Sequence, residues 1–175
     1  MQLIGKRVVL RALRNSDAQS LYENAKDKEI SFYTTLPNPY TLADAQKFIR
    51  NAKRDFGRGA YEFCIELDGK VIGMMSLTKV DSKNMNAEVG YWLGMNYWKK
   101  GFASEALKLL VHFGFTKLNL VRIYAKVLHE NIDSSLLLEK NGFKLEGRLR
   151  KNLFRNGIRY DTLLYGFLKD EYAGE

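Results

Sequence analysis

The chain contains 175 residues, of which 46% are hydrophobic and 27% are charged, and its formal net charge is +8 at pH 7. A chain of this length suits one domain that buries roughly two-thirds of its surface, and we expect a single domain over residues 1–175 with its core from about residue 7 to residue 170. No apolar run approaches the ~20 residues of a membrane helix. One cysteine excludes an intrachain disulfide, and two widely separated histidines argue against a zinc site.

The composition favours a cytosolic protein in a reducing compartment, without a metal and without membrane attachment. Its positive charge favours anionic partners such as a nucleotide cofactor, an RNA-rich assembly or nucleic acid. Cys64 alternates with Phe63 and Ile65 in an expected strand, and we interpret it as a packing residue rather than a nucleophile. The sequence leaves open whether the protein is a monomer or a homodimer.

The N-terminal part of the chain predicts one strand and two helices. Residues 7–13 suit a strand, and Ser16 with Gln19 fits the S-x-x-Q capping box at the start of a helix. Both prolines lie within residues 30–40, which we expect to form a loop with aromatic side chains. Thr41 is expected to cap a second helix, whose apolar residues recur at helical spacing as Ala45, Phe48, Ile49, Ala52 and Phe56.

Three antiparallel strands are expected next. Residues 61–67 alternate between apolar and polar side chains, and Asp68-Gly69 is a strong signal for a two-residue hairpin turn into residues 70–80. The third strand covers residues 87–93. The preceding Gly57-Arg58-Gly59 lacks the last glycine of a dinucleotide-binding fingerprint, so we interpret it as the turn that ends a helix.

The stretch from Asn86 to Ala106 passes from a strand through a basic turn into a helix. Lys99, Lys100 and Gly101 stand directly before the apolar helical pattern of residues 102–117. Free N–H groups at a helix N-terminus and the positive end of the helix dipole attract anions. We therefore expect a phosphorylated cofactor to bind at this turn.

The C-terminal part predicts a strand over residues 121–127, a short helix over residues 134–140 and a hairpin. The hairpin strands cover residues 143–154 and 158–169, with Asn156-Gly157 as the turn. The expected fold class is therefore α+β, with a mixed, mostly antiparallel twisted sheet flanked by helices. Its central strand–helix–strand unit would pair in parallel through a right-handed crossover.

Three blocks of sequence, taken in order, resemble the GNAT superfamily of acyl-CoA-dependent N-acetyltransferases. Residues 98–103, WKKGFA, resemble its pyrophosphate loop R/Q-x-x-G-x-G/A, with a tryptophan at the first position. Residues 131–143 resemble its N-x-x-S…EK-x-GF segment, and residues 147–165 its terminal G-R…G…D-x-x-x-Y pattern. The likeness covers nearly the whole chain. It is most similar to the Rim-type branch, which acetylates protein N-terminal amines and often has an aromatic residue at the first loop position.

The resemblance implies a GNAT-like fold, acetyl-CoA as the cosubstrate and no metal. It also implies that backbone N–H groups of the loop bind the pyrophosphate and that the strand before the loop pairs with the pantetheine arm. In the family the asparagine of the second block contacts the pantetheine amide, and a local helix cap is the alternative role for it here. The cofactor-binding residues implied are Trp92, Leu93, Gly94, Trp98, Lys99, Lys100, Gly101, Phe102, Ala103, Ser104 and Asn131.

Glu88 is the expected proton acceptor for the amine. Strand alternation places Glu88, Gly90 and Trp92 on one face, and the missing side chain of Gly90 leaves room beside the carboxylate. Glu88 would act directly or through a water, and its alternative role is an ion-paired residue on a strand. Glu62 is a second, weaker candidate. The backbone N–H of Leu93 would polarise the thioester oxygen, a contact typically worth ~3 kcal/mol in the transition state.

Ser134 is expected to assist the leaving thiolate. Many relatives use a tyrosine on the helix after the asparagine, but residues 136–138 are leucines here. Ser134 matches the serine of the Rim-type pattern and would hydrogen-bond the thiolate or relay a proton. It is equally suited to a helix N-terminus, and both roles are compatible.

The acceptor is not determined by the sequence. We expect a protein N-terminal amine, whose pKa of about 7.7–8.0 makes it easier to deprotonate than a lysine side chain. A basic surface would then favour docking on ribosomal or other RNA-rich assemblies. A small amine (a polyamine, an amino acid or an antibiotic) stays open, as do a non-catalytic CoA-binding module and a nucleic-acid-binding domain. Candidates for the acceptor side are Tyr33, Tyr40, Tyr160 and Tyr165.

Overall fold

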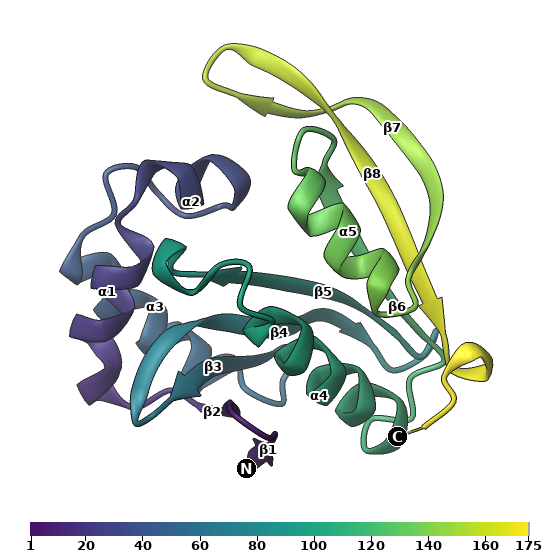
Figure 1. Ribbon diagram of the computed structural model, residues 1–175, viewed down its shortest axis with the longest axis horizontal. Helices are drawn as coiled ribbons and strands as arrows, with labels where there is room; N and C mark the ends of the chain where they lie inside the picture. Colours follow the sequence, from purple (N-terminus) through teal and green to yellow (C-terminus); the bar gives the residue numbers. More distant parts are fainter. Residues whose placement is uncertain (175) are drawn as a thin grey trace.

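One eight-stranded sheet runs through the computed structural model, which describes residues 1–174 (Figure 1). Its strand order is β1-β2-β3-β4-β5-β6-β8-β7, and every neighbouring pair is antiparallel except β5–β6, which is parallel. The expected α+β class is therefore confirmed. The strands are β1 Gln2–Ile4, β2 Val9–Ala12, β3 Tyr61–Leu67, β4 Lys70–Asp81, β5 Asn86–Leu93, β6 Arg122–Leu128, β7 Lys144–Arg155 and β8 Ile158–Leu168.

Helices cover both faces of the sheet. The α-helices are α1 Ala18–Ala25, α2 Lys28–Tyr33, α3 Leu42–Asp55, α4 Phe102–Thr116 and α5 Ile132–Lys140, and short 3₁₀ turns cover Asn15–Asp17, Met95–Tyr97 and Lys169–Glu171. Helix α4 packs on one face against β2, β4 and β6, whereas α1 and α3 pack on the other face against β4 and β3. Because strand residues alternate, Phe63 joins the core under α4 while Cys64 joins the core under α1 and α3.

The parallel pair β5–β6 is short. Its register covers only Asn86–Glu88 against residues 122–124, after which the two strands separate (Figure 1). Strand β6 then continues along β8, and β5 continues along β4. The sheet therefore opens into a V whose two sides carry unpaired backbone groups.

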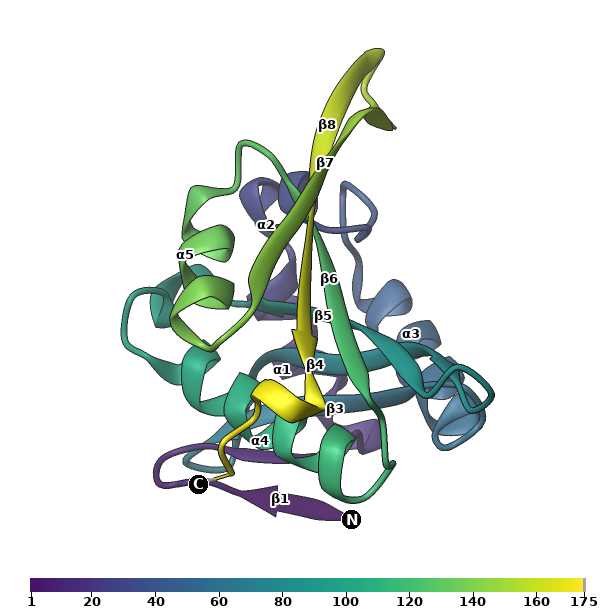
Figure 2. The same ribbon diagram turned by 90° about the vertical axis from the view of Figure 1, so that its right-hand side faces the viewer.

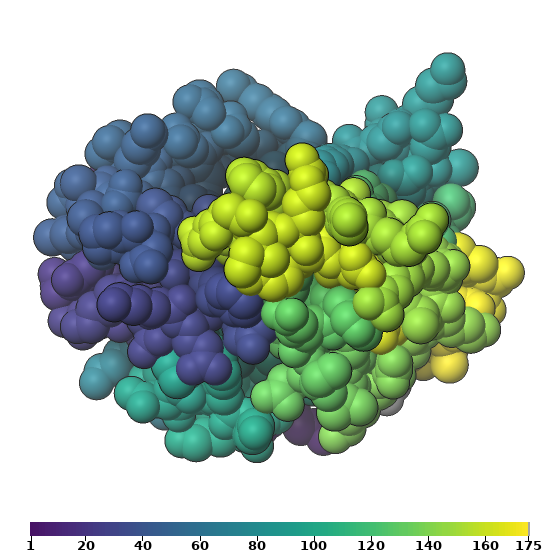
Figure 3. Space-filling view, turned by 90° about the horizontal axis from the view of Figure 1, so that it is seen from above, coloured from purple at the N-terminus to yellow at the C-terminus, as the bar shows by residue number. Residues whose placement is uncertain are grey.

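Strands β7 and β8 extend beyond the sheet as a long hairpin, which we call the arm (Figure 2). Its turn is Asn156-Gly157, where both residues have positive φ, as expected for a two-residue hairpin. Near the turn, Arg155 donates hydrogen bonds to the carbonyl oxygens of Thr34, at 2.6 Å, and Ser31, at 3.3 Å. Viewed from above, the yellow tip of the arm lies against the purple-blue segment that contains α2 (Figure 3). The arm thus joins the C-terminal part of the chain to the N-terminal helices.

The predicted start of the first helix was wrong. Helix α1 begins at Ala18 with Asp17 at the N-cap position, and the side chain of Gln19 donates to Glu23 instead of closing a capping box with Ser16. Asp17 also accepts the backbone N–H of Arg14, at 2.6 Å. The reason is the guanidinium of Arg11, which fixes both oxygens of Asp17 beneath the helix start.

Two further expectations are corrected at the N-terminal end. The first strand is shorter than residues 7–13 and pairs with a preceding strand, β1, that was not predicted. The expected loop over residues 30–40 begins as helix α2, because Asp27 caps it by accepting the N–H of Glu29 and Ile30 is buried. By contrast, the Thr41–Asp44 capping box of α3 is present as predicted.

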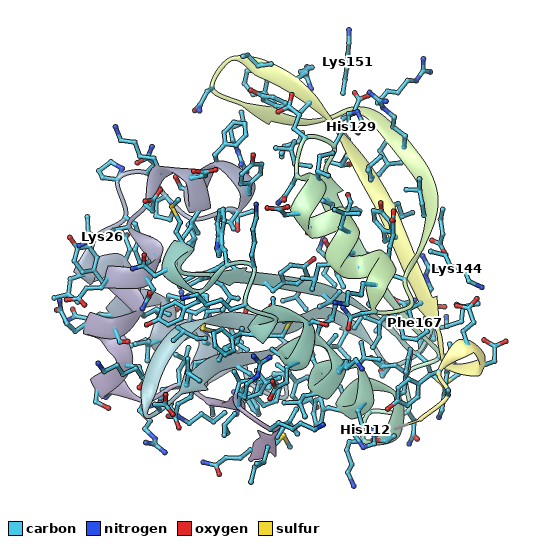
Figure 4. All side chains as sticks on the ribbon, in the orientation of Figure 1. Lys26, His112, His129, Lys144, Lys151 and Phe167 are labelled. Carbon is cyan, nitrogen blue, oxygen red and sulfur yellow. The ribbon has the colours of Figure 1, made fainter. Side chains whose placement is uncertain are left out.

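The remaining compositional expectations concern the cysteine, metals and membranes. Cys64 is fully buried, and burial raises the pKa of its thiol to about 12, as suits a packing residue. His112 lies on α4 and His129 near the arm, at opposite ends of the view in Figure 4. Among residues 1–174, no group of His, Cys, Asp and Glu could hold a metal ion. None of the helices in this range is long and apolar enough to cross a membrane.

Candidate active site

A cleft of about 980 Å³ opens where β5 and β6 separate. It extends from the N-termini of α4 and α5 to helix α2 and the segment after it. Most of the expected site residues line it, namely Glu88, Trp92, Leu93, Trp98, Lys99, Gly101, Ala103, Ser104, Asn131 and Ser134. Gly94, Lys100 and Phe102 were also expected, but within the described chain they are not part of its lining. Gly94 packs against Asn24, and the ring of Phe102 lies under the guanidinium of Arg7.

The turn before α4 has the conformation of an anion cradle. Gly101 lies at the helix N-cap with a φ of 83°, a left-handed conformation that glycine adopts without strain. The first helical hydrogen bond runs from Glu105 N to Gly101 O, so the N–H groups of residues 102–104 have no acceptor within the helix. These free donors and the helix dipole suit a pyrophosphate.

Arg7 fastens this loop to the N-terminal segment. Its Nη1 donates to the carbonyl of Lys100, at 3.0 Å, and its Nε to Glu105, at 2.9 Å. Glu105 also accepts the backbone N–H groups of Arg7 and Val8. Partial burial disfavours the charged form of Glu105, but these hydrogen bonds outweigh it and lower the pKa. Arg7 was not among the expected site residues, because 98 residues separate it from Glu105 and no local pattern links them.

Trp98 shapes the other end of the loop. Its indole N–H donates to the carbonyl oxygen of Leu93, at 2.7 Å, so the loop folds back on the end of β5. The N–H of Gly94 donates to Ile72 of β4, at 2.9 Å. Because N–H groups alternate in direction along a strand, the N–H of Leu93 points away from β4, toward the opening left by β6. This is the direction needed to hydrogen-bond a thioester oxygen in the cleft.

Glu88 stands at the apex of the V, at the last register position between β5 and β6. Its Oε2 atom lies 2.6 Å from the ammonium of Lys79, and its side chain is 18% exposed. A bulge in β4 gives Lys79 a positive φ of 50° and accompanies this pairing. The hydrogen bond that Lys79 donates to Glu88 raises the pKa of Lys79. Glu88 therefore reaches the cleft as part of an ion pair, the alternative role considered for it.

Glu62 lies in the same cleft on β3. Its register partner is Ser76 of β4, whose own partner on β5 is Gly90. Burial raises the pKa of Glu62, and a hydrogen bond with Ser76 opposes that shift only in part. Among residues 1–174 it has no basic partner within ion-pair distance, in contrast to Glu88.

Ser134 sits in the first turn of α5, where its hydroxyl oxygen lies 2.7 Å from the hydroxyl of Tyr91. Asn131 caps this helix by accepting the N–H of Ser134, at 3.1 Å, which is the local role considered for it. Tyr91 was not among the expected residues, and burial raises its pKa above the ordinary value. It alternates with Gly90 and Trp92, and the separation of β6 is what lets it reach α5.

The tyrosines expected near the acceptor fall into two groups. Tyr33 lines the cleft, and Tyr160 lies in the arm, edge-on to Phe32 at 5.9 Å between ring centroids. Tyr40 and Tyr165 are buried instead, and Tyr165 donates its hydroxyl to Glu139. Of these four tyrosines, only Tyr33 is among the residues that line the cleft.

Comparison with known proteins agrees with this geometry. The model of the acetyltransferase (GNAT) domain family matches residues 7–144. The uncharacterized N-acetyltransferase p20 of Bacillus licheniformis is 36% identical over 98% of this chain and 98% of its own length. The ribosomal-protein-serine acetyltransferase of Escherichia coli is 32% identical over 73% of this chain and 72% of its own length. The spermidine N(1)-acetyltransferase of Escherichia coli is 32% identical over 65% of this chain and 61% of its own length.

A solved structure extends the likeness to the cosubstrate. The microcin C7 self-immunity acetyltransferase MccE, in complex with acetyl-CoA and AMP, is 27% identical over 93% of each chain, with a TM-score of 0.85. The anion cradle and the inward-pointing N–H of Leu93 fit the pyrophosphate and the thioester of such a molecule. The expected fold and enzyme class are confirmed: the chain belongs to the GNAT acetyltransferases, and it is an acetyl-CoA-dependent N-acetyltransferase.

Proposed function

We propose that this enzyme acetylates the α-amino group of a protein N-terminus. The observation that carries the proposal is the likeness to the ribosomal-protein-serine acetyltransferase, which spans 73% of the chain. The net charge of +8 supports it, because a basic surface is drawn to RNA-rich particles on which such N-termini are presented. The cleft reaches α2 and the following segment, which leaves an acceptor side opposite the cofactor loop.

The cleft residues then have separate tasks. Backbone donors of the α4 turn bind the pyrophosphate, and Leu93 N–H polarises the thioester carbonyl as the amine nitrogen attacks its carbon. Glu88 accepts a proton from the attacking nitrogen. The carbon–sulfur bond breaks, and the Ser134 hydroxyl donates a hydrogen bond to the departing thiolate. Tyr91 holds that hydroxyl in place.

A small polyamine is the second candidate acceptor. It is favoured by the likeness to the spermidine N(1)-acetyltransferase and by the carboxylates in the cleft, which would attract a polycation. The acceptor side of the cleft includes Glu29, Glu62, Glu88 and Glu130. The overall charge of +8 opposes this candidate, because it repels polycations at long range.

The test is an assay of free-thiol release from acetyl-CoA with a panel of acceptors. The panel contains peptides with free N-terminal serine or alanine, the same peptides with blocked N-termini, spermidine and single amino acids. We expect turnover on the free peptides and none above hydrolysis on the blocked ones. Turnover on spermidine alone would replace the proposed acceptor with a polyamine, and CoA binding without turnover on any amine would contradict both.

A further inference from the structure

A shallow trough crosses three strands on the cleft face of the sheet. Glu62, Ser76 and Gly90 are register partners on β3, β4 and β5, and all three line the cleft. Neighbouring strands lie about 4.8 Å apart, so the Cα atoms of Glu62 and Gly90 are separated by roughly 10 Å. A Cβ atom built on Gly90 would meet only the Ser76 hydroxyl, at 3.5 Å. The space above Gly90 is therefore open, with a carboxylate at its far end.

A second carboxylate borders the same space. Glu88 precedes Gly90 by two residues on β5, so its side chain lies on the same face, about 7 Å along the strand. The open space above Gly90 is thus bordered by Glu62 across the strands and by Glu88 along β5. An amine cation placed there would be within reach of both.

The two carboxylates differ in their surroundings. Glu88 is held by Lys79 at 2.6 Å, whereas Glu62 has a hydroxyl neighbour, Ser76, and no ion-pair partner within residues 1–174. A partly buried carboxylate without a cation costs stability, and such groups gather at functional sites. Its burial and the nearby charge of Asp55 both raise the pKa of Glu62, so it is adapted to exchange a proton.

We propose that Glu62 is a second catalytic carboxylate of this enzyme, which binds the ammonium form of the acceptor above Gly90 and removes its first proton. Acetylation of an ammonium must remove two protons from nitrogen. The first passes to Glu62 and leaves a neutral amine whose lone pair attacks the thioester carbon. The second leaves the nitrogen after the carbon–nitrogen bond forms and passes to Glu88. One proton ends on the thiol of CoA and the other is returned to water. This inference rests on the proposed role of Glu88, but it holds for either class of acceptor.

The test compares Glu62→Gln with Glu88→Gln and with Glu23→Gln, an exposed control on α1, using whichever amine the wild-type enzyme acetylates. Rates are measured from about pH 6 to about pH 9, across the pKa of an α-amine. We expect Glu62→Gln to raise KM for the amine at least tenfold at neutral pH, and the loss to shrink where the amine is already neutral. Glu62→Gln should not change the KM for acetyl-CoA, and the control Glu23→Gln should not change either KM. An unchanged amine KM and an unchanged pH profile would overturn the assignment.

Two further measurements separate this role from a structural one. Because burial raises its pKa in the folded state, ionised Glu62 lowers stability as pH rises above the ordinary value of 4.5. Glu62→Gln should therefore raise the melting temperature at neutral pH and give no gain below that value. Gly90→Ala fills the space without changing charge and should raise only the amine KM. A lower melting temperature for Glu62→Gln, or an amine KM unaffected by Gly90→Ala, would contradict the inference. If the wild type acetylates no amine at all, the proposed function fails first.

Discussion

The hydroxyl groups of Tyr91 and Ser134 lie 2.7 Å apart and connect β5 to the first turn of α5 across the floor of the cleft. The tyrosine hydroxyl is also 3.4 Å from the carbonyl oxygen of Ser134, which can only accept. When Tyr91 donates to the serine oxygen, the serine proton is left to face the cleft. In that arrangement the pair supplies one oriented donor, where many related enzymes use a tyrosine on the helix.

Removing the tyrosine hydroxyl should slow the reaction through Ser134. We expect Tyr91→Phe to lower kcat about fivefold, in line with the loss of roughly 1 kcal/mol for one neutral hydrogen bond, with little effect on either KM. Tyr61→Phe, on β3 where the ring packs against the core, is the control. The double variant Tyr91→Phe with Ser134→Ala should be no slower than Ser134→Ala alone, because the two residues act as one unit. If the loss of kcat in the double variant equals the product of the two single losses, Tyr91 acts independently of Ser134.

Replacing Glu88 should change the pH dependence of the reaction. General-base catalysis typically contributes about 10²–10⁴-fold, so we expect Glu88→Gln to lower kcat/KM for the amine within that range at neutral pH. Without this carboxylate the reaction depends on solvent as proton acceptor, and the pH–rate profile should move to higher pH. Acetyl-CoA affinity, measured by calorimetry, should stay within twofold. If the profile does not move, Glu88 is not the proton acceptor, and its pairing with Lys79 is structural.

The cofactor loop depends on the conformation of Gly101. Its φ of 83° costs an L-residue about 1–2 kcal/mol, and an added Cβ would lie 3.1 Å from the guanidinium of Arg7. We expect Gly101→Ala to lower the melting temperature and to raise KM for acetyl-CoA while leaving the amine KM unchanged. Gly147→Ala is a matched control, because nothing lies within 4 Å of its added Cβ. Equal effects of the two substitutions on acetyl-CoA would argue against the cradle.

Local signals predicted much of this fold. The turns at Asp68-Gly69 and Asn156-Gly157 adopt positive φ as expected, because each two-residue turn is specified by its own residues. Helix α2 was missed, since the prolines at 37 and 39 suggested a loop while the cap at Asp27 and the burial of Ile30 stabilise a short helix just before them.

The site was harder to predict where it depends on long-range packing. Glycine, lysines and a helix start marked the cofactor loop within a few residues. Tyr91 and Ser134, in contrast, are 43 residues apart and meet only because β5 and β6 separate. The Lys79–Glu88 ion pair likewise depends on a bulge in β4, and no glycine or other turn residue in the sequence predicts that bulge. Contacts of this kind follow from sheet topology rather than from sequence spacing.

A buried ion network beneath α1 should control the acid stability of the protein. Asp17 accepts two hydrogen bonds from Arg11, at 2.8 and 2.9 Å, and Arg11 is 3% exposed. Burial opposes ionisation of Asp17, but these bonds and the N–H of Arg14 lower its pKa below 3.8. Its contribution is therefore present above 3.8 and disappears as pH falls through the lower, folded-state pKa. We expect Asp17→Asn to cost about 3–5 kcal/mol in urea unfolding at neutral pH, because it removes the buried one of the two carboxylates that pair with Arg11. The difference from wild type should shrink on acidification. Asp55→Asn, which breaks an exposed pair with Arg54, should change stability little. A similar small loss for Asp17→Asn would show that Glu66 alone, which accepts from the Nε of Arg11, compensates that charge.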